Sequence, residues 1–238
     1  MISIKLIQKH ELVDAQNLLN SKGIIAYLGG FTMMDKISQK QKQQNSLWAA
    51  FVDDKMVGVA MIGGRPQSHI IKYGEIAVLP EFRRMRVASS LYFAMTIQGI
   101  IEGRRLFEDT IVGDNPTQFF VLPTMGLKMN GELEHKTASA KSICIFQFSM
   151  LWDGAFEKML SRVPSTTTVQ VAGGEYADDL YTKNCVIYSK YSEQYLPIAE
   201  RLRNDVLSEK HNISVVNVSR DNRKKTGGAV QSQLSVLD

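Results

Sequence analysis

One junction in the sequence, from a strand into a helix through a short turn, constrains the fold more than any other stretch. Residues 73–79, YGEIAVL, are largely apolar and end at Pro80, which cannot donate to a sheet ladder. Downstream, apolar residues recur at helical spacing with no proline before Gly103, namely Val87, Leu91, Ala94 and Met95. The pattern therefore predicts a strand, a turn, and a helix that begins near Val87.

The turn carries three arginines, Arg83, Arg84 and Arg86. The partial positive charge of a helix N-terminus disfavours each cation there by roughly 0.3–1 kcal/mol. Exposed backbone N–H groups and the helix dipole also make such a junction an anion site, and a guanidinium matches phosphate well. A bound anion would compensate the three charges. The alternative is that they are solvated surface residues whose stems cover apolar neighbours.

Two stretches of the chain match known signatures. Val78, Pro80, Phe82, Arg83 and Ala88 fall in register on V-x-P-x-[YF]-[RQ]-x-x-G-x-[GA], with Arg86 at the position of the first glycine. The stretch DNPTQFFVLPTMGLK fits N-x(10)-G-[FLY] through Asn115, Gly126 and Leu127. In these two segments the chain resembles the GNAT superfamily of acyl-CoA-dependent N-acyltransferases, whose first signature wraps the cofactor pyrophosphate. The resemblance covers residues 1–149.

The resemblance implies a site for acetyl-CoA or another acyl-CoA. Its cofactor-binding residues would be Ala77, Val78, Leu79, Arg83, Arg84, Arg86, Val87, Ala88 and Asn115. In the family a backbone N–H of the strand before the turn holds the thioester carbonyl, which points to Ala77–Leu79. Because the signatures contain no cysteine nucleophile, the acceptor amine would attack the thioester directly. A glycine at position 86 would let the pyrophosphate approach the backbone closely. The Arg86 side chain would either bind the pyrophosphate through its guanidinium or close the cofactor pocket.

Glu75 is the candidate general base, since it lies in an otherwise apolar strand where many GNAT enzymes carry a glutamate. The alternative is a solvent-facing strand residue, and Glu108 and Asp109 on the next strand are weaker candidates. The tyrosine that often acts as the general acid in the second signature falls on Leu122, with Tyr73 and Tyr92 as the remaining hydroxyls to consider.

Composition places the chain among ordinary globular enzymes. Of 238 residues, 44% are hydrophobic and 22% charged, and no apolar run approaches a membrane span or a signal peptide. Cys144 and Cys185 are expected to be buried free thiols in the cytoplasm. The four histidines are scattered, so no metal site is expected. The net charge of +4 suits an anionic cofactor.

The order of elements predicts an α/β (α+β) fold with a mixed, mostly antiparallel central sheet flanked by helices. Strands are expected at 1–7, 46–52, 56–62, 69–79, 105–112, 126–136 and 141–150, and helices at 11–20, from 87, and at 115–125. Between the first two strands, GNAT proteins place segments that shape the acceptor site. Four residues in this segment are therefore candidates to line the acceptor site, namely Tyr27, Phe31, Met33 and Met34. The alternative is that they pack in the core.

The domain organisation is predicted to be a GNAT-like domain over 1–149, a small α/β appendage over 150–219 and a disordered tail over 220–238. In the appendage we expect helices at 153–163 and 192–210 and strands at 165–173, 183–190 and 212–219. The appendage is short for independent folding, so it should pack on the first domain.

Three functions fit these observations. The first is transfer of an acyl group, expected to be acetyl, from coenzyme A to an amine acceptor that the sequence does not identify. The second is a nucleic-acid-modifying enzyme of the same fold, suggested only by the basic balance of the chain and by Arg104, Arg105, Arg223, Lys224 and Lys225. The third is a catalytically silent interaction protein, which Arg86 and Leu122 favour. No membrane partner is expected.

Overall fold

The structure is a computed structural model of the whole chain, and it describes residues 1–21, 47–63, 69–112, 121–134, 142–152, 154–190, 192–208 and 211–217. The strands are β1 (Ile2–Leu6), β2 (Leu47–Val52), β3 (Lys55–Gly63), β4 (Ile70–Val78), β5 (Leu106–Val112), β6 (Lys128–Glu134), β7 (Ser142–Ser149), β8 (Thr168–Gly173) and β9 (Ile213–Asn217). The helices are α1 (Leu12–Leu19), α4 (Val87–Ile101), α6 (Ala155–Leu160), α7 (Glu175–Ser189) and α8 (Tyr195–Leu207), with the 3-10 segments η1 (Lys9–Glu11) and η2 (Pro80–Phe82).

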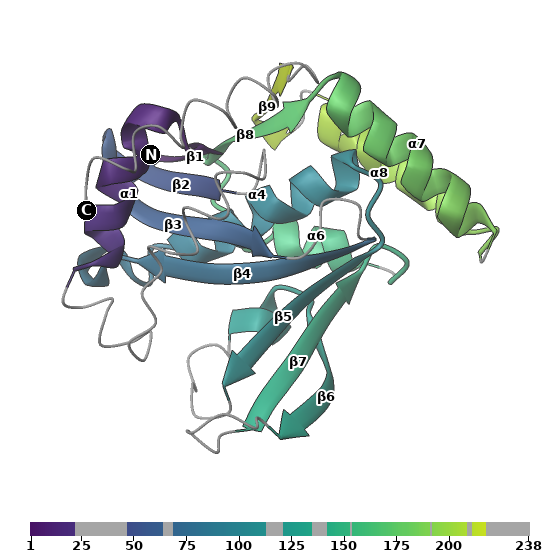
Figure 1. Cartoon of the computed structure of the whole chain (residues 1–238), viewed down its shortest axis with the longest axis horizontal. Coiled ribbons are helices and arrows are strands. Elements are labelled where there is room, and N and C mark those ends of the chain that lie inside the picture. Colours follow the sequence, from purple (N-terminus) through teal and green to yellow (C-terminus); the bar gives the residue numbers. More distant parts are fainter. Residues whose placement is uncertain are drawn as a thin grey trace, which may run out of the picture.

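The nine described strands form a single sheet in the order β6-β7-β5-β4-β3-β2-β1-β8-β9 (Figure 1). Neighbours are antiparallel from β1 to β4 and among β5, β6 and β7. They are parallel at β4–β5, β1–β8 and β8–β9. The predicted mixed, mostly antiparallel sheet flanked by helices is confirmed. β2 and β3 form a hairpin around Asp53 and Asp54, which adopt the positive φ angles of a tight turn.

The pairing of β4 with β5 is short, and this shapes the centre of the molecule. Only Ile70, Ile71 and Lys72 of β4 pair with β5, opposite residues 106–108. Beyond Lys72, β4 continues to pair with β3, while β5, β7 and β6 turn away from it (Figure 1). Within the described residues, the β5-facing side of β4 after Lys72 therefore has no strand partner.

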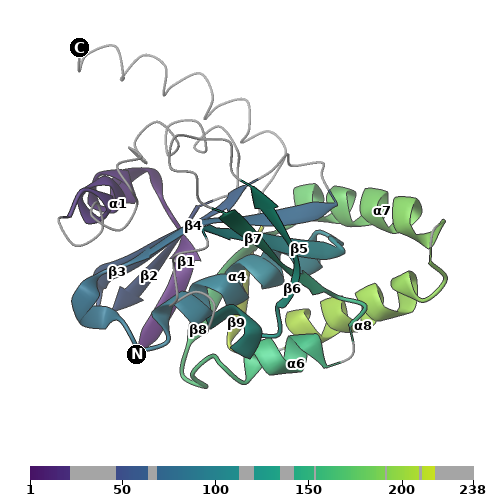
Figure 2. The ribbon, with the colours of Figure 1, turned by 90° about the horizontal axis from the view of Figure 1, so that it is seen from below.

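Two sets of helices cover the two faces of the sheet (Figure 2). The long helix α4 is apolar on almost every side, as expected for a helix enclosed by other elements, and it lies at the centre of the larger buried cluster. Gly99 allows this close approach, because a Cβ there would lie 2.4 Å from the Phe107 ring. On the opposite face α1 covers β3 through a smaller cluster that includes Ala15, Leu18 and Val59.

The C-terminal part extends the same sheet rather than forming a second one. β8 pairs in parallel with β1, and β9 pairs with β8. The strand predicted at 183–190 is wrong: these residues belong to α7. Their β-branched run resembles a strand, but buried residues of α7 recur at helical spacing, at Ala177, Leu180, Asn184 and Tyr188. The predicted helices and the other two strands of this part are confirmed in type, and the domain boundary at 149/150 stays a prediction.

Side chains from the C-terminal part complete the end of α4. The last carbonyls of a helix lack intrahelical partners. Here the Ile101 carbonyl accepts from Arg203 Nε at 3.3 Å, the Glu102 carbonyl from Asn184 Nδ2 at 2.8 Å, and the Gly103 carbonyl from the Tyr195 hydroxyl. The guanidinium of Arg203 also favours the negative end of the helix dipole. The C-terminal end of α4 is thus capped by residues far along the chain.

A buried glutamine makes a second link between the two parts. Gln98 Nε2 donates to the Ala172 carbonyl at 2.9 Å, and Gln98 Oε1 accepts from the Ala172 N–H at 2.8 Å. Beside it, Glu102 and Arg104 form a buried ion pair with 2.6 Å between Oε2 and Nη2. This polar contact joins the last turn of α4 to β8 in a site without solvent, where each unmade hydrogen bond would be costly.

Outside the described residues lie the acceptor-site candidates Tyr27, Phe31, Met33 and Met34 and the predicted tail 220–238. Of the predicted helix at 115–125, the described part is helical over 121–124. Among the described helices, none combines the length and the apolar character that crossing a bilayer requires.

Candidate active site

The junction between β4 and α4 has the predicted form of strand, turn and helix. Leu79 leaves the sheet with its N–H donated to the Val57 carbonyl at 2.9 Å. The 3-10 segment η2 follows, with Pro80 at its start, and the Arg83 N–H closes it onto the Pro80 carbonyl at 3.2 Å. α4 then begins at Val87, so the three arginines occupy the turn directly before the helix.

Arg86 adopts the backbone conformation that glycine favours. It is the N-cap of α4, with φ 64° and ψ 18° in the left-handed region, and Arg84 has φ 67°. A non-glycine residue in this region costs roughly 1–2 kcal/mol, because Cβ approaches the following carbonyl. The turn therefore keeps the shape that a glycine would give at position 86 while carrying a guanidinium there.

The arginine side chains are exposed around the start of α4. Arg83 Nε donates to the Val78 carbonyl at 3.3 Å, and Arg86 Nη1 donates to the Ser161 carbonyl, after α6, at 3.4 Å. The first turn of α4 contains no acidic residue, so no carboxylate there offsets these charges. With the N–H groups of the first helical turn, the arginines make this end of α4 a concentrated positive site.

The other predicted cofactor residues flank this turn. Ala77 and Val78 end β4, Leu79 starts the turn, and Val87 and Ala88 open α4. Val87 is buried, and Gly58 of β3 makes room for it, since a Cβ at position 58 would lie 3.2 Å from Val87 Cγ1. The structure thus brings together Ala77–Leu79, Arg83, Arg84, Arg86, Val87 and Ala88. The predicted partner Asn115 lies outside the described residues.

Glu75 lies in a distortion of β4. Ile62 pairs with Tyr73, but Ala60 pairs with Ile76, so β4 contains one extra residue between these pairs. Gly74 occupies this bulge, where a Cβ would meet the Met61 carbonyl oxygen at 2.5 Å. Bulges re-aim side chains and are frequent beside active sites. The backbone of Glu75 is thus at the bulge, and its side chain is outside the described part of the structure.

A buried network of hydroxyls and one carboxyl lies between β4, α4 and β5. The Tyr73 hydroxyl contacts Thr96 Oγ1 at 2.5 Å, and the Tyr92 hydroxyl donates to Asp109 Oδ2. Burial raises the pKa of Asp109 to about 7. Burial also raises the pKa of both tyrosines, and the nearby Asp109 carboxyl adds to this effect. Asp109, at 6% exposure, is packed inside this face of the sheet.

Leu122 stands where the second signature often has a tyrosine, and it is completely buried in the main core with 0% exposure. It has no hydroxyl, so this position supplies no proton. The other two hydroxyls considered, Tyr73 on β4 and Tyr92 on α4, are both engaged in the buried network.

Sequence reasoning missed the contacts that reach this region from the C-terminal part. The carbonyl of Ser161 meets Arg86, and Gln98, Asn184 and Tyr195 fasten α4 to the C-terminal helices and to β8. One signal was present, since Gln98 is the only strongly polar side chain in the apolar stretch AMTIQGII. A buried amide in such a helix requires partners from elsewhere in the fold.

A comparison with protein families gives a match over residues 20–105 to the acetyltransferase (GNAT) family. This range contains β2, β3, β4, the arginine turn and α4. A search of curated proteins gives no significant match.

Solved structures share the fold at low sequence identity. The ribosomal-protein-S18-alanine N-acetyltransferase from Escherichia coli aligns with a TM-score of 0.51 and 13% identity, covering 63% of this chain and 94% of the other. An N-acetyltransferase from Staphylococcus aureus Mu50 gives 0.50 and 17%, covering 63% and 98%. A GNAT-family acetyltransferase from Desulfovibrio desulfuricans gives 0.54 and 16%, covering 63% and 99%. Residues 20–105, which include the strand, turn and helix described above, thus match the acetyltransferase (GNAT) family, and the solved structures share the fold of the chain.

Proposed function

We propose that the protein transfers an acyl group, expected to be acetyl, from coenzyme A to a primary amine. The observation that carries this proposal is the continuity of β4 and the arginine turn. β4 lacks a strand partner on its β5 side after Lys72, and it leads directly into Arg83, Arg84 and Arg86 at the start of α4. An unpaired strand edge can hydrogen-bond an extended amide-bearing arm, and a positive helix start suits a diphosphate.

The described residues fit coenzyme A by their chemistry. The left-handed backbone at Arg84 and Arg86 turns the chain around the start of α4, as close approach of a phosphate to backbone N–H groups requires. When bound, an acyl-CoA supplies a thioester whose carbon is open to attack by an amine. The chain's part is to orient that group, and the backbone N–H groups of Ala77–Leu79 are our candidates to polarise its carbonyl.

We assign proton removal from the acceptor to Glu75, whose backbone lies at the bulge of β4. A carboxylate placed there takes a proton from the ammonium before attack. Leu122 offers no hydroxyl, and Tyr73 and Tyr92 are already hydrogen-bonded and buried. We therefore assign the proton that the departing thiolate takes up to water.

Arg86 provides the test of cofactor binding. Arg86→Gln removes the charge from the turn and is expected to weaken acetyl-CoA binding by roughly 1.5–3 kcal/mol, the range for hydrogen bonds to charged groups. Arg86→Gly keeps the left-handed turn without strain and should leave the unliganded protein as stable as before or slightly more so. Calorimetric titration with acetyl-CoA and free coenzyme A measures the first effect, and thermal unfolding measures the second.

The matched control is Arg201→Gln, which removes the same charge from an exposed position on α8 and should leave coenzyme A affinity unchanged. Release of free thiol in the presence of primary amines then reports transfer. Tight acyl-CoA binding without amine-dependent thiol release would favour the catalytically silent alternative. Failure of the unmodified protein to bind any acyl-CoA would contradict the proposal.

A further inference from the structure

A row of polar side chains crosses four strands of the sheet. Lys72 on β4 pairs with Glu108 on β5, Glu108 pairs with Gln147 on β7, and Gln147 pairs with Lys128 on β6. Because residues paired across strands share a face, these four side chains lie on one face of the sheet. The row contains one carboxylate between two lysines.

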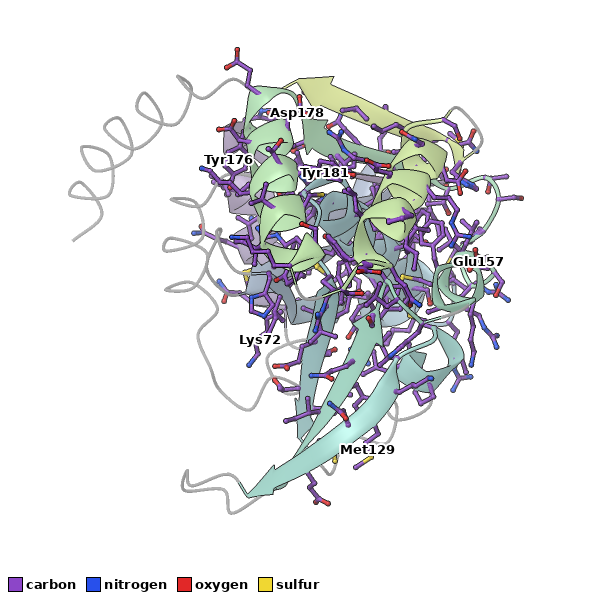
Figure 3. The ribbon with its side chains drawn as sticks, turned by 90° about the vertical axis from the view of Figure 1, so that its right-hand side faces the viewer. Lys72, Met129, Glu157, Tyr176, Asp178 and Tyr181 are labelled. Carbon is purple, nitrogen blue, oxygen red and sulfur yellow. The ribbon has the colours of Figure 1, made fainter. Side chains whose placement is uncertain are left out.

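This face is the one opposite α4. Phe107 and Phe148, the neighbours of Glu108 and Gln147 along their strands, contact each other and belong to the core around α4. Since side chains alternate along a strand, Glu108 and Gln147 point the other way. On that side, α1 packs mainly on β3. Lys72 projects outward from the sheet there (Figure 3), and Glu108 is half-buried.

Glu108 is held by a chain of amides. Gln147 Nε2 donates to Glu108 Oε2 at 3.2 Å, and Gln147 Oε1 accepts from Asn130 Nδ2 at 2.5 Å. Among the described residues, Glu108 forms no ion pair with Lys72, although the two stand directly opposite each other. The carboxylate is thus oriented by one neutral donor, Gln147, and forms no ion pair with a described cation.

Glu108 lies beside the unpaired edge of β4. The pair of Lys72 and Glu108 is the last one before β4 and β5 separate, so Glu108 borders the unpaired edge of β4. On the α4 side that point is closed by the packed network of Tyr73, Tyr92 and Asp109. An acceptor approaching the edge of β4 must therefore come from the face that carries Glu108.

We propose that Glu108 binds the ammonium group of the acceptor, and that Gln147 and Asn130 are positioning residues that orient its carboxylate. This rests on the proposed acyltransfer and adds to it the place where the amine is recognised. Lys72 acts against the interaction, because its positive charge stands next to the site that receives the ammonium. Recognition would thus select for an acceptor whose single amine can be placed at Glu108 clear of Lys72.

The side-chain amide of Gln147 reports directly on this site in a nitrogen-15 NMR spectrum, with its signal assigned by loss in Gln147→Leu. Titration of the full chain with 1-aminopentane should shift this signal saturably, while 1-pentanol should not. Glu108→Gln should weaken binding of 1-aminopentane at least tenfold. Lys72→Met should strengthen binding of the same amine by about two- to fivefold, since a positive charge that repels the ammonium is removed. Glu132→Gln, at an exposed carboxylate of β6, is the matched control and should behave as the unmodified protein.

The two variants are expected to change the amine affinity in opposite directions, with Glu108→Gln lowering it and Lys72→Met raising it. A purely structural role of these residues would not produce this pattern. If the Gln147 signal shows no saturable change up to the solubility of the amine, or if Glu108→Gln binds it equally well, the assignment is overturned. Acetyl-CoA affinity is measured separately by calorimetry. Loss of the amine response with intact cofactor binding would refute the Glu108 site alone, and absent cofactor binding with a normal amine response would refute the acyltransferase proposal alone.

Discussion

Asp109→Asn is expected to raise the free energy of unfolding by roughly 4 kcal/mol at pH 8 to 9, because about 1.4 kcal/mol accompanies each unit of pKa shift. Burial raises the pKa of Asp109 from 3.8 to about 7, so keeping this group ionised costs stability in the folded protein. Asparagine has almost the same shape, is always neutral, and can still accept the hydrogen bond from the Tyr92 hydroxyl.

The sign of the pH dependence follows from the two protonation states. Between about pH 4 and pH 7 the folded protein holds a proton on Asp109 that the unfolded chain has released, so stability falls as the pH rises through this window. Urea unfolding at a series of pH values should show this fall in the unmodified protein and a flatter curve in Asp109→Asn. Asp14→Asn, at an exposed carboxylate on α1, should keep the original curve. Parallel curves for the unmodified protein and Asp109→Asn would show that the carboxyl is ionised in the fold without cost.

Gln98→Ala is expected to lower the free energy of unfolding by roughly 3 kcal/mol, since each buried group left without a partner costs about 1–3 kcal/mol. The change removes both hydrogen bonds to Ala172 and leaves the N–H and carbonyl of that residue unpaired inside the molecule. It also removes a buried side chain from the last turn of α4, which adds a cavity. Denaturant unfolding followed by circular dichroism measures the loss.

Asn204→Ala provides the comparison for this helix substitution, because it removes an exposed amide from α8 and should change stability by no more than about 0.5 kcal/mol. Gln98→Leu separates the two contributions, since leucine fills most of the volume but makes no hydrogen bond. Equal stabilities of Gln98→Leu and the unmodified protein would mean that the amide pair with Ala172 contributes nothing net.

The elements that local pattern determines were predictable from sequence. The hairpin of β2 and β3 follows from two apolar runs around a polar turn, and the β4–α4 junction follows from Pro80 and a change of periodicity from strand to helix. α7 was not predictable in the same way. Its segment CVIY has the β-branched composition of a strand, but the contacts of Asn184 and Tyr188 with distant elements select the helix.

The same distinction holds for the candidate site, where residues adjacent in sequence were predictable and residues brought together by the tertiary fold were not. Ala77–Leu79, Arg83, Arg84, Arg86, Val87 and Ala88 are adjacent in sequence, so a single local pattern was enough to group them. The row formed by Lys72, Glu108, Gln147 and Lys128 was not visible, because its members come from four strands whose order and register are tertiary properties. Likewise, Asp109 looked like a surface carboxylate at a strand start until the packing of Tyr92 against it was known.

The capping of α4 has a consequence for how the protein is made. Asn184, Tyr195 and Arg203 lie 82, 92 and 102 residues after the carbonyls that they cap. Since a ribosome adds about 5–20 residues per second, the end of α4 leaves the ribosome on the order of 4–20 s before its partners do. During that interval water must satisfy its last carbonyls. The capping of the C-terminal end of α4 is thus complete only after Arg203 has been synthesised.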